Sequence, residues 1–257
     1  MKKCAAFCIL LVLLTGACSN APGADGEIRL VGKSWRTCRL TLGMDSAEAA
    51  RLFNGLKLGF EGGLFNTGAT GSYWLMDRLE YEDGEPSLKL YRIYVETPKV
   101  TAPNGKRVGD TISADDAADA SCRYRSPYSE GRICYEYDMS DYYFIMEVGA
   151  DRKLAAWNYS ASSLADVSEI EFNEDRTELT ATFQNGKVLE FKVGMPHREF
   201  IEYMNENRMS YMFSPVDMEA ADEGYFFEYV IWGELDIEFL GPKTDTEKKI
   251  AFFPVYD

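Results

Sequence analysis

The chain has 257 residues, with 27 Lys and Arg, 42 Asp and Glu, one His and six Cys. Its 46% apolar and 14% aromatic content excludes a disordered chain and is enough for a sizeable core. The net charge of −15 argues against nucleic acid as a partner and against docking on anionic lipid through overall charge. A single His excludes most metal sites built from histidines.

The first 17 residues have the pattern of an export signal. Two lysines precede an apolar run (residues 5–14) that is too short to span a bilayer as a helix. The stretch Leu14-Thr15-Gly16-Ala17 then leads into Cys18. This pattern resembles the lipobox of bacterial lipoprotein precursors. The resemblance implies that residues 1–17 are removed and that Cys18 is lipidated; an ordinary secretory signal cut nearby is the alternative.

The residues after Cys18 are small and polar, with Gly and Pro among them, so residues 18–28 are expected to form a flexible tether. The lipoprotein resemblance implies an exported protein that meets the membrane through its lipid anchor. In diderm hosts, Ser after the lipidated Cys favours the outer membrane, and Ser19 stands there.

Most of the following chain alternates short β-type runs with turn signals, such as Asp83-Gly84. Helices are expected at 46–56, with Asp45 as N-cap, and at 196–208; residues 113–121 form a weaker candidate. The pattern predicts an α+β fold, mostly antiparallel β-sheet meanders with two or three short helices packed on the sheet. The expected strands are 74–82, 87–96, 132–138, 142–148, 154–159, 167–172, 178–183, 188–193, 225–232, 235–240 and 250–255.

Two helix starts share a pattern, at Leu40–Asp45 and Phe191–Pro196: a β-type run, then Gly-Met, then the helix. They resemble a module of the SmpA/OmlA-type assembly lipoproteins and the β-lactamase inhibitor proteins. The resemblance implies a helix packed on an antiparallel sheet, and no functional residue comes with it. We expect a first module at 29–104 and a second, β-rich one at 105–257, with one continuous domain as the alternative.

Nucleophile and metalloprotease motifs are absent: there is no G-x-S-x-G, S-x-x-K or H-E-x-x-H. We therefore predict no catalytic residue, no cofactor and no metal site. His197 follows Pro196 in the first turn of the second helix, where imidazolium is disfavoured. We expect it to be a surface residue.

The most unusual segment is 123–143, which holds six of the 16 tyrosines and three arginines. Tyr and Arg provide much of the energy of protein interfaces. Arg125, Tyr128 and Arg132 are therefore predicted to contact a partner; the alternative is that the tyrosines fill a sheet face. Cys122 directly precedes the segment and Cys134 lies within it, and the two either form a disulfide or remain free thiols in a core.

Two functions follow from these observations. The first is a membrane-tethered module of the cell envelope that binds a protein and catalyses no reaction. The second is an envelope hydrolase that uses paired carboxylates on carbohydrate, which would need a pocket holding two carboxylates about 5–9 Å apart. The missing nucleophile motifs and the tethered, strand-rich plan favour the first.

Overall fold

The computed structural model describes residues 27–57, 61–63, 66–70, 72–126, 129–215, 225–231, 235–241 and 249–253. The expected signal and Cys18 lie outside these ranges. Antiparallel strands dominate the described chain, and its α-helices are α1 (Ser46–Asn54) and α2 (His197–Glu206). The prediction of a β-rich fold with few helices is therefore confirmed. No helix in the described part is long and apolar enough to cross a membrane.

The first element is a hairpin of β1 (Glu27–Val31) and β2 (Thr37–Thr41), joined by a 3-10 turn at Lys33–Trp35. Strand β1 begins at Glu27, within the range 18–28 in which a tether was expected. Helix α1 follows, and the Asp45 carboxylate accepts a hydrogen bond from the Glu48 amide at 3.1 Å, as expected of an N-cap. Its Ala49 and Phe53 face the core.

The largest sheet has eight strands in the order β3-β4-β5-β6-β10-β9-β8-β7, and all its pairings are antiparallel. The module boundary expected after residue 104 falls between β6 and β7, so the two expected modules share this sheet. Residues 113–121 contain a short 3-10 turn, Asp115–Ala117. The strands are β3 (Glu61–Gly63), β4 (Asn66–Thr70), β5 (Tyr73–Glu82), β6 (Glu85–Val95), β7 (Cys122–Arg125), β8 (Ile133–Asp138), β9 (Tyr143–Val148) and β10 (Leu154–Ser160).

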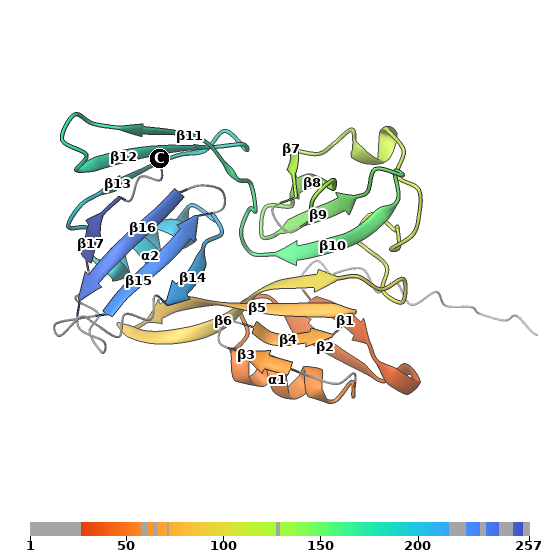
Figure 1. Cartoon of the computed structure of the whole chain (residues 1–257). Coiled ribbons are helices and arrows are strands. Elements are labelled where there is room, and N and C mark those ends of the chain that lie inside the picture. The colour runs from red at the N-terminus through yellow and green to blue at the C-terminus, as the bar shows by residue number, and fades with distance from the viewer. Residues whose placement is uncertain are drawn as a thin grey trace, which may run out of the picture.

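The rest of the described chain forms two smaller antiparallel sheets around α2 (Figure 1). The first is a three-stranded meander, β11 (Val167–Phe172), β12 (Glu178–Phe183) and β13 (Val188–Lys192). The second holds β14 (Met212–Pro215), β15 (Tyr225–Ile231), β16 (Leu235–Gly241) and β17 (Lys249–Phe252).

Two main hydrophobic cores result. The first lies between one face of the eight-stranded sheet, the β1–β2 hairpin and α1, with Trp157 and Tyr159 among its fully buried members. The second lies around α2, where Phe200, Ile201 and Met204 are fully buried, as the helical pattern predicted. A smaller cluster covers the other face of the eight-stranded sheet beneath β7 and β8.

The β5–β6 hairpin is long enough to take part in both main cores. Its turn, Asp83-Gly84, has positive φ at both residues (51° and 92°), which suits the twist of a two-residue hairpin. The base of the hairpin is buried in the first core, whereas Leu79 and Tyr81 near its tip pack on the second. The Tyr211 hydroxyl donates a hydrogen bond to the Leu79 carbonyl at 2.9 Å, which fixes the tip against the second core.

Candidate binding surface

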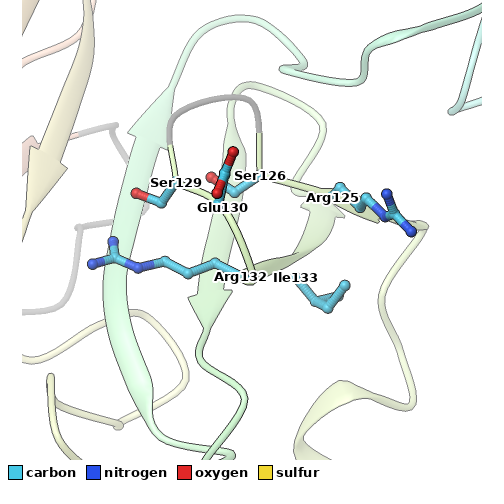
Figure 2. Close-up of a pocket in the computed structure, with 7 residues that line it drawn as sticks. Arg125, Ser126, Ser129, Glu130, Arg132 and Ile133 are labelled. Atoms are coloured by element: carbon cyan, nitrogen blue, oxygen red, sulfur yellow. The ribbon is translucent and has the colours of Figure 1, made fainter.

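The hairpin of β7 and β8 carries the segment predicted to contact a partner. Its turn is closed by hydrogen bonds from the Ser126 amide to the Arg132 carbonyl (3.0 Å) and from the Arg132 amide to the Ser129 carbonyl (3.3 Å). An open hollow of about 670 Å³ adjoins this turn (Figure 2). Its described lining residues are Arg125, Ser126, Ser129, Glu130, Gly131, Arg132 and Ile133.

The two predicted arginines point to opposite sides of the hairpin (Figure 2). Arg125 is exposed at the end of β7. Arg132 turns toward the sheet, where its Nη1 donates to the Tyr94 hydroxyl at 3.0 Å and to Glu147 Oε2 at 3.3 Å. Only 27% of the Arg132 side chain is exposed and none of the Glu147 side chain is. Arg132 therefore braces the turn, whereas Arg125 is exposed to solvent.

Glu147 is the centre of a polar network on this face of the sheet. Its carboxylate also accepts hydrogen bonds from the Tyr94 hydroxyl (3.2 Å) and the Asn158 amide (3.2 Å). The Asn158 carbonyl oxygen in turn accepts from Arg92 Nε at 2.8 Å. Burial, together with the Glu147 charge, raises the pKa of Tyr94 well above its ordinary value, so this hydroxyl remains a donor at neutral pH.

The charge on Arg132 is stabilised by the same network. Burial works against the guanidinium charge, but the neighbouring Tyr94 and Glu147 outweigh it, and the pKa of Arg132 is raised. The side chain is thus a permanent cation held beside a buried anion. Because planar guanidinium groups bond carboxylates in fixed geometry, the pair holds the end of β8 in place.

A second buried carboxylate, Glu136, lies two residues from Cys134 on the same face of β8. Only 1% of Glu136 is exposed. It accepts hydrogen bonds from the Tyr124 hydroxyl (2.9 Å), the Ser163 hydroxyl (2.6 Å) and the Leu164 amide (3.0 Å). Burial raises the pKa of Glu136, while these three donors lower it in part. Its partners place it where the eight-stranded sheet meets the second half of the chain.

Of the two alternatives for the cysteines, this structure has the second: Cys122 and Cys134 are buried free thiols. In the β7–β8 register Cys122 lies opposite Glu136, and Cys134 lies opposite Tyr124, so the two are diagonal neighbours. Diagonal positions are about 7–8 Å apart, further than a disulfide usually spans. The backbone pairing of β7 with β8, rather than a disulfide, holds the strands of Cys122 and Cys134 together.

The tyrosines of the segment mainly pack the sheet. Tyr128 lies outside the described residues; the five others of the segment are buried or half-buried. Tyr142 packs against the buried Tyr159 at 4.4 Å between ring centroids, and Tyr143 is covered by the Arg208 guanidinium at 4.2 Å. These five tyrosines therefore fit the alternative interpretation, in which the tyrosines of the segment fill a sheet face.

The surface suits polar binding. The hollow offers the exposed Arg125 and Glu130 beside the Ser129 hydroxyl. Glu130 is the one carboxylate among its described lining residues. The two buried carboxylates, Glu136 and Glu147, have hydrogen-bond donors around both oxygens and almost no exposure, so neither is placed to reach a substrate.

His197 was expected at the surface, and this was wrong. Its side chain is buried, with Nδ1 3.1 Å from the Tyr81 hydroxyl and its ring edge-on to Phe239 at 5.3 Å. The sequence pattern placed it on the polar side of the helix start. The tip of the β5–β6 hairpin, which is distant in sequence, covers it.

The polar network was not foreseen. Arg92, Glu147 and Asn158 each interrupt a strand that is otherwise apolar (Leu90–Val95, Tyr143–Val148 and Leu154–Tyr159). A charged or amide side chain in the middle of such a strand is the signal that could have identified them, because a buried charge needs partners. Which partners they meet depends on strand order.

Comparison with family models, with curated proteins and with solved structures finds no match to this chain.

Proposed function

We propose that this chain is an exported lipoprotein of the cell envelope that binds a protein partner and catalyses no reaction. Cys18 carries the lipid, and the short polar stretch before β1 tethers the folded domain to the membrane, the outer membrane if the host is diderm. The support is the basic and apolar leader ending in Leu14-Thr15-Gly16-Ala17 before Cys18. Two acyl chains hold a protein on a bilayer stably, where one does so only marginally.

The partner binds at the β7–β8 hairpin, with Arg125 as the main contact and Arg132 as a positioning residue. The observation that carries this proposal is the open hollow beside a turn that is braced from below by the Arg132–Glu147 pair. A rigid surface loses less entropy on binding than a loose one. Arg123 and Arg125 are exposed on a strongly acidic chain, so they attract an acidic region of the partner.

The location is tested by Cys18→Ala. Wild-type protein should incorporate radiolabelled palmitate and sediment with membranes, and the variant should be exported without label and stay in the soluble fraction. A wild-type protein that is soluble and unlabelled would contradict the lipid anchor.

The binding surface is tested by photocrosslinking in cells. A photoreactive phenylalanine analogue is placed at position 130, which is exposed and lines the hollow, and a matched control carries it at the exposed position of Glu174. We expect one protein adduct from position 130 and not from position 174, and Arg125→Met, introduced with the probe, should weaken that adduct. Identical adducts from both positions would show that the hairpin is not the binding surface.

A further inference from the structure

The charges of the chain are divided unequally along its length. Residues 27–57 contain six Lys and Arg against three Asp and Glu, whereas residues 58–257 contain 19 against 38. The basic segment forms β1, β2 and α1, which lie at the far end of the molecule from β11–β13 (Figure 1). The molecule is therefore electrically polar, and its positive end is the one that follows the tether.

The turn between β1 and β2 presents a tryptophan to solvent. Trp35 is 80% exposed, the highest exposure among the large apolar side chains of the described residues. Ser34 and Trp35 have positive φ values of 53° and 57°. This backbone is unfavourable for side chains other than Gly, so it is retained only where its surroundings fix it. The turn is closed by hydrogen bonds from the Gly32 amide to the Arg36 carbonyl (2.7 Å) and from the Arg36 amide to the Lys33 carbonyl (3.1 Å).

Three cationic residues belong to this turn or to the segment that packs beside it. Lys33 and Arg36 flank Trp35, and the Lys33 amide bonds the Leu56 carbonyl at 3.2 Å, which brings Lys57 beside the turn. All three side chains belong to exposed residues. The ion pairs of this segment in the described structure, Arg39–Glu27 and Arg51–Glu48, leave these three cations out.

The turn is held rigidly on α1. A Cβ atom at Gly32 would lie 2.5 Å from the Leu56 carbonyl oxygen and 2.6 Å from its Cβ, so only Gly allows this approach. The hairpin beneath the turn is fixed by Ile28, Leu30 and Leu40, which are fully buried in the first core. Trp35 is thus an exposed aromatic side chain on a rigid support.

We propose that this cationic turn, defined as Lys33, Trp35, Arg36 and Lys57, rests on the surface of the bilayer and contacts anionic phospholipid headgroups. The indole ring has an apolar body and a polar N–H, which suits the membrane–water interface. Lys and Arg near an anionic surface add electrostatic attraction. The inference rests on the proposed lipid anchor, because the acidic remainder of the chain would otherwise keep the protein away from such a surface.

The tether is long enough for this contact. Eight residues lie between Cys18 and Glu27, so the nine residue-to-residue steps, fully extended, reach about 30 Å. The turn lies one strand beyond Glu27, and β1 has five residues, a length of about 17 Å. The anchored chain can therefore fold back along β1 and place the turn on the bilayer. The acidic body is then directed away from the membrane, with the β7–β8 hairpin left free.

Tryptophan quenching by brominated lipid tests the proposal. The lipidated protein is reconstituted into vesicles of phosphatidylcholine with or without phosphatidylglycerol, each containing phosphatidylcholine brominated near the headgroup. The contribution of Trp35 is the difference in fluorescence emission between the wild-type protein and Trp35→Phe. The matched control is Trp74→Phe, which gives the contribution of a half-exposed tryptophan on another strand. We expect the bromine to reduce the Trp35 signal by about half in anionic vesicles and less in neutral ones.

The outcomes separate the two proposals. A wild-type protein that does not float with the vesicles contradicts the lipid anchor itself. If the protein floats but bromine leaves its Trp35 emission unchanged, the lipid anchor stands and the cationic turn does not contact the membrane. A protein adduct formed by a photoreactive residue at position 35 would then show that the turn binds a protein. Equal quenching in neutral and anionic vesicles, or in a variant with Gln at positions 33, 36 and 57, would overturn the headgroup contact.

Discussion

Replacement of Arg132 with Met should destabilise the protein because it leaves the buried Glu147 carboxylate without its cation. The Arg132–Glu147 contact is 3.3 Å long, and Glu147 has no exposure. Glu147 keeps two neutral donors, Tyr94 and Asn158, so it loses one charge-assisted hydrogen bond rather than all its partners. Such a bond contributes about 1.5–3 kcal/mol, and Arg132 is partly solvated, so we expect a loss of about 2 kcal/mol in the free energy of unfolding.

Glu147→Gln should cost less, about 1 kcal/mol, because it removes the buried charge and leaves Arg132 able to turn toward water. The double variant should cost about 1.5 kcal/mol, so the two losses overlap by about 1.5 kcal/mol. Arg125→Met is the matched control: it removes an exposed arginine from the same hairpin and should change stability by less than about 0.5 kcal/mol.

Urea denaturation followed by circular dichroism measures all four variants. Two results would refute this account of the network. The first is equal destabilisation by Arg132→Met and Arg125→Met. The second is additive losses in the double variant, which would show that Arg132 and Glu147 do not interact energetically.

Three further predictions concern buried side chains. Burial raises the pKa of Cys38 to about 12 and that of Cys122 to about 11, so iodoacetamide at pH 8 should leave both unmodified in the folded protein. After unfolding without reductant, Cys38, Cys122 and Cys134 should all be alkylated. If Cys122 and Cys134 still resisted alkylation, the two would be joined by a disulfide. Burial raises the pKa of Glu136 above its ordinary value of 4.5, so the folded protein holds this proton more tightly than the unfolded chain. The free energy of unfolding should therefore fall as pH rises from 4.5 through the folded pKa, and Glu136→Gln should flatten that slope in urea titrations; an unchanged slope would contradict this assignment. Phe200→Ala should lower the free energy of unfolding by about 3–5 kcal/mol in the same titrations, and a loss below about 1 kcal/mol would show that α2 does not pack as described.

Local patterns predicted the elements of this fold well. The turn signal at Asp83-Gly84 predicted the β5–β6 hairpin, and the spacing of Phe200, Ile201 and Met204 predicted the buried face of α2. These features depend on neighbours within a few residues. The expected strands did not include β1, β3, β4, β7 or β14, although β1 alternates buried and half-buried side chains in Ile28-Arg29-Leu30.

Features that depend on strand order could not be read in advance. We expected a division after residue 104, but β6 pairs with β10, which joins both sides of that division in one sheet. His197 has the neighbours of a surface residue along the chain, and a hairpin more than 100 residues away covers it. The same holds for the candidate site: the pattern identified Arg125 and Arg132 together, and only the arrangement of β8, β9, β10 and β6 distinguishes the exposed Arg125 from the half-buried Arg132.

The β5–β6 hairpin takes part in both main cores, and this has a consequence for the order in which the chain is synthesised and folds. Strands β5 and β6 leave the ribosome well before α2 and the sheets around it, and Leu79 meets its partner Tyr211 only across a separation of 132 residues. Until then the hairpin tip has its apolar side chains in water. A nascent chain therefore exposes apolar side chains at the hairpin tip for much of its synthesis, and such a surface is prone to aggregation until the second core forms.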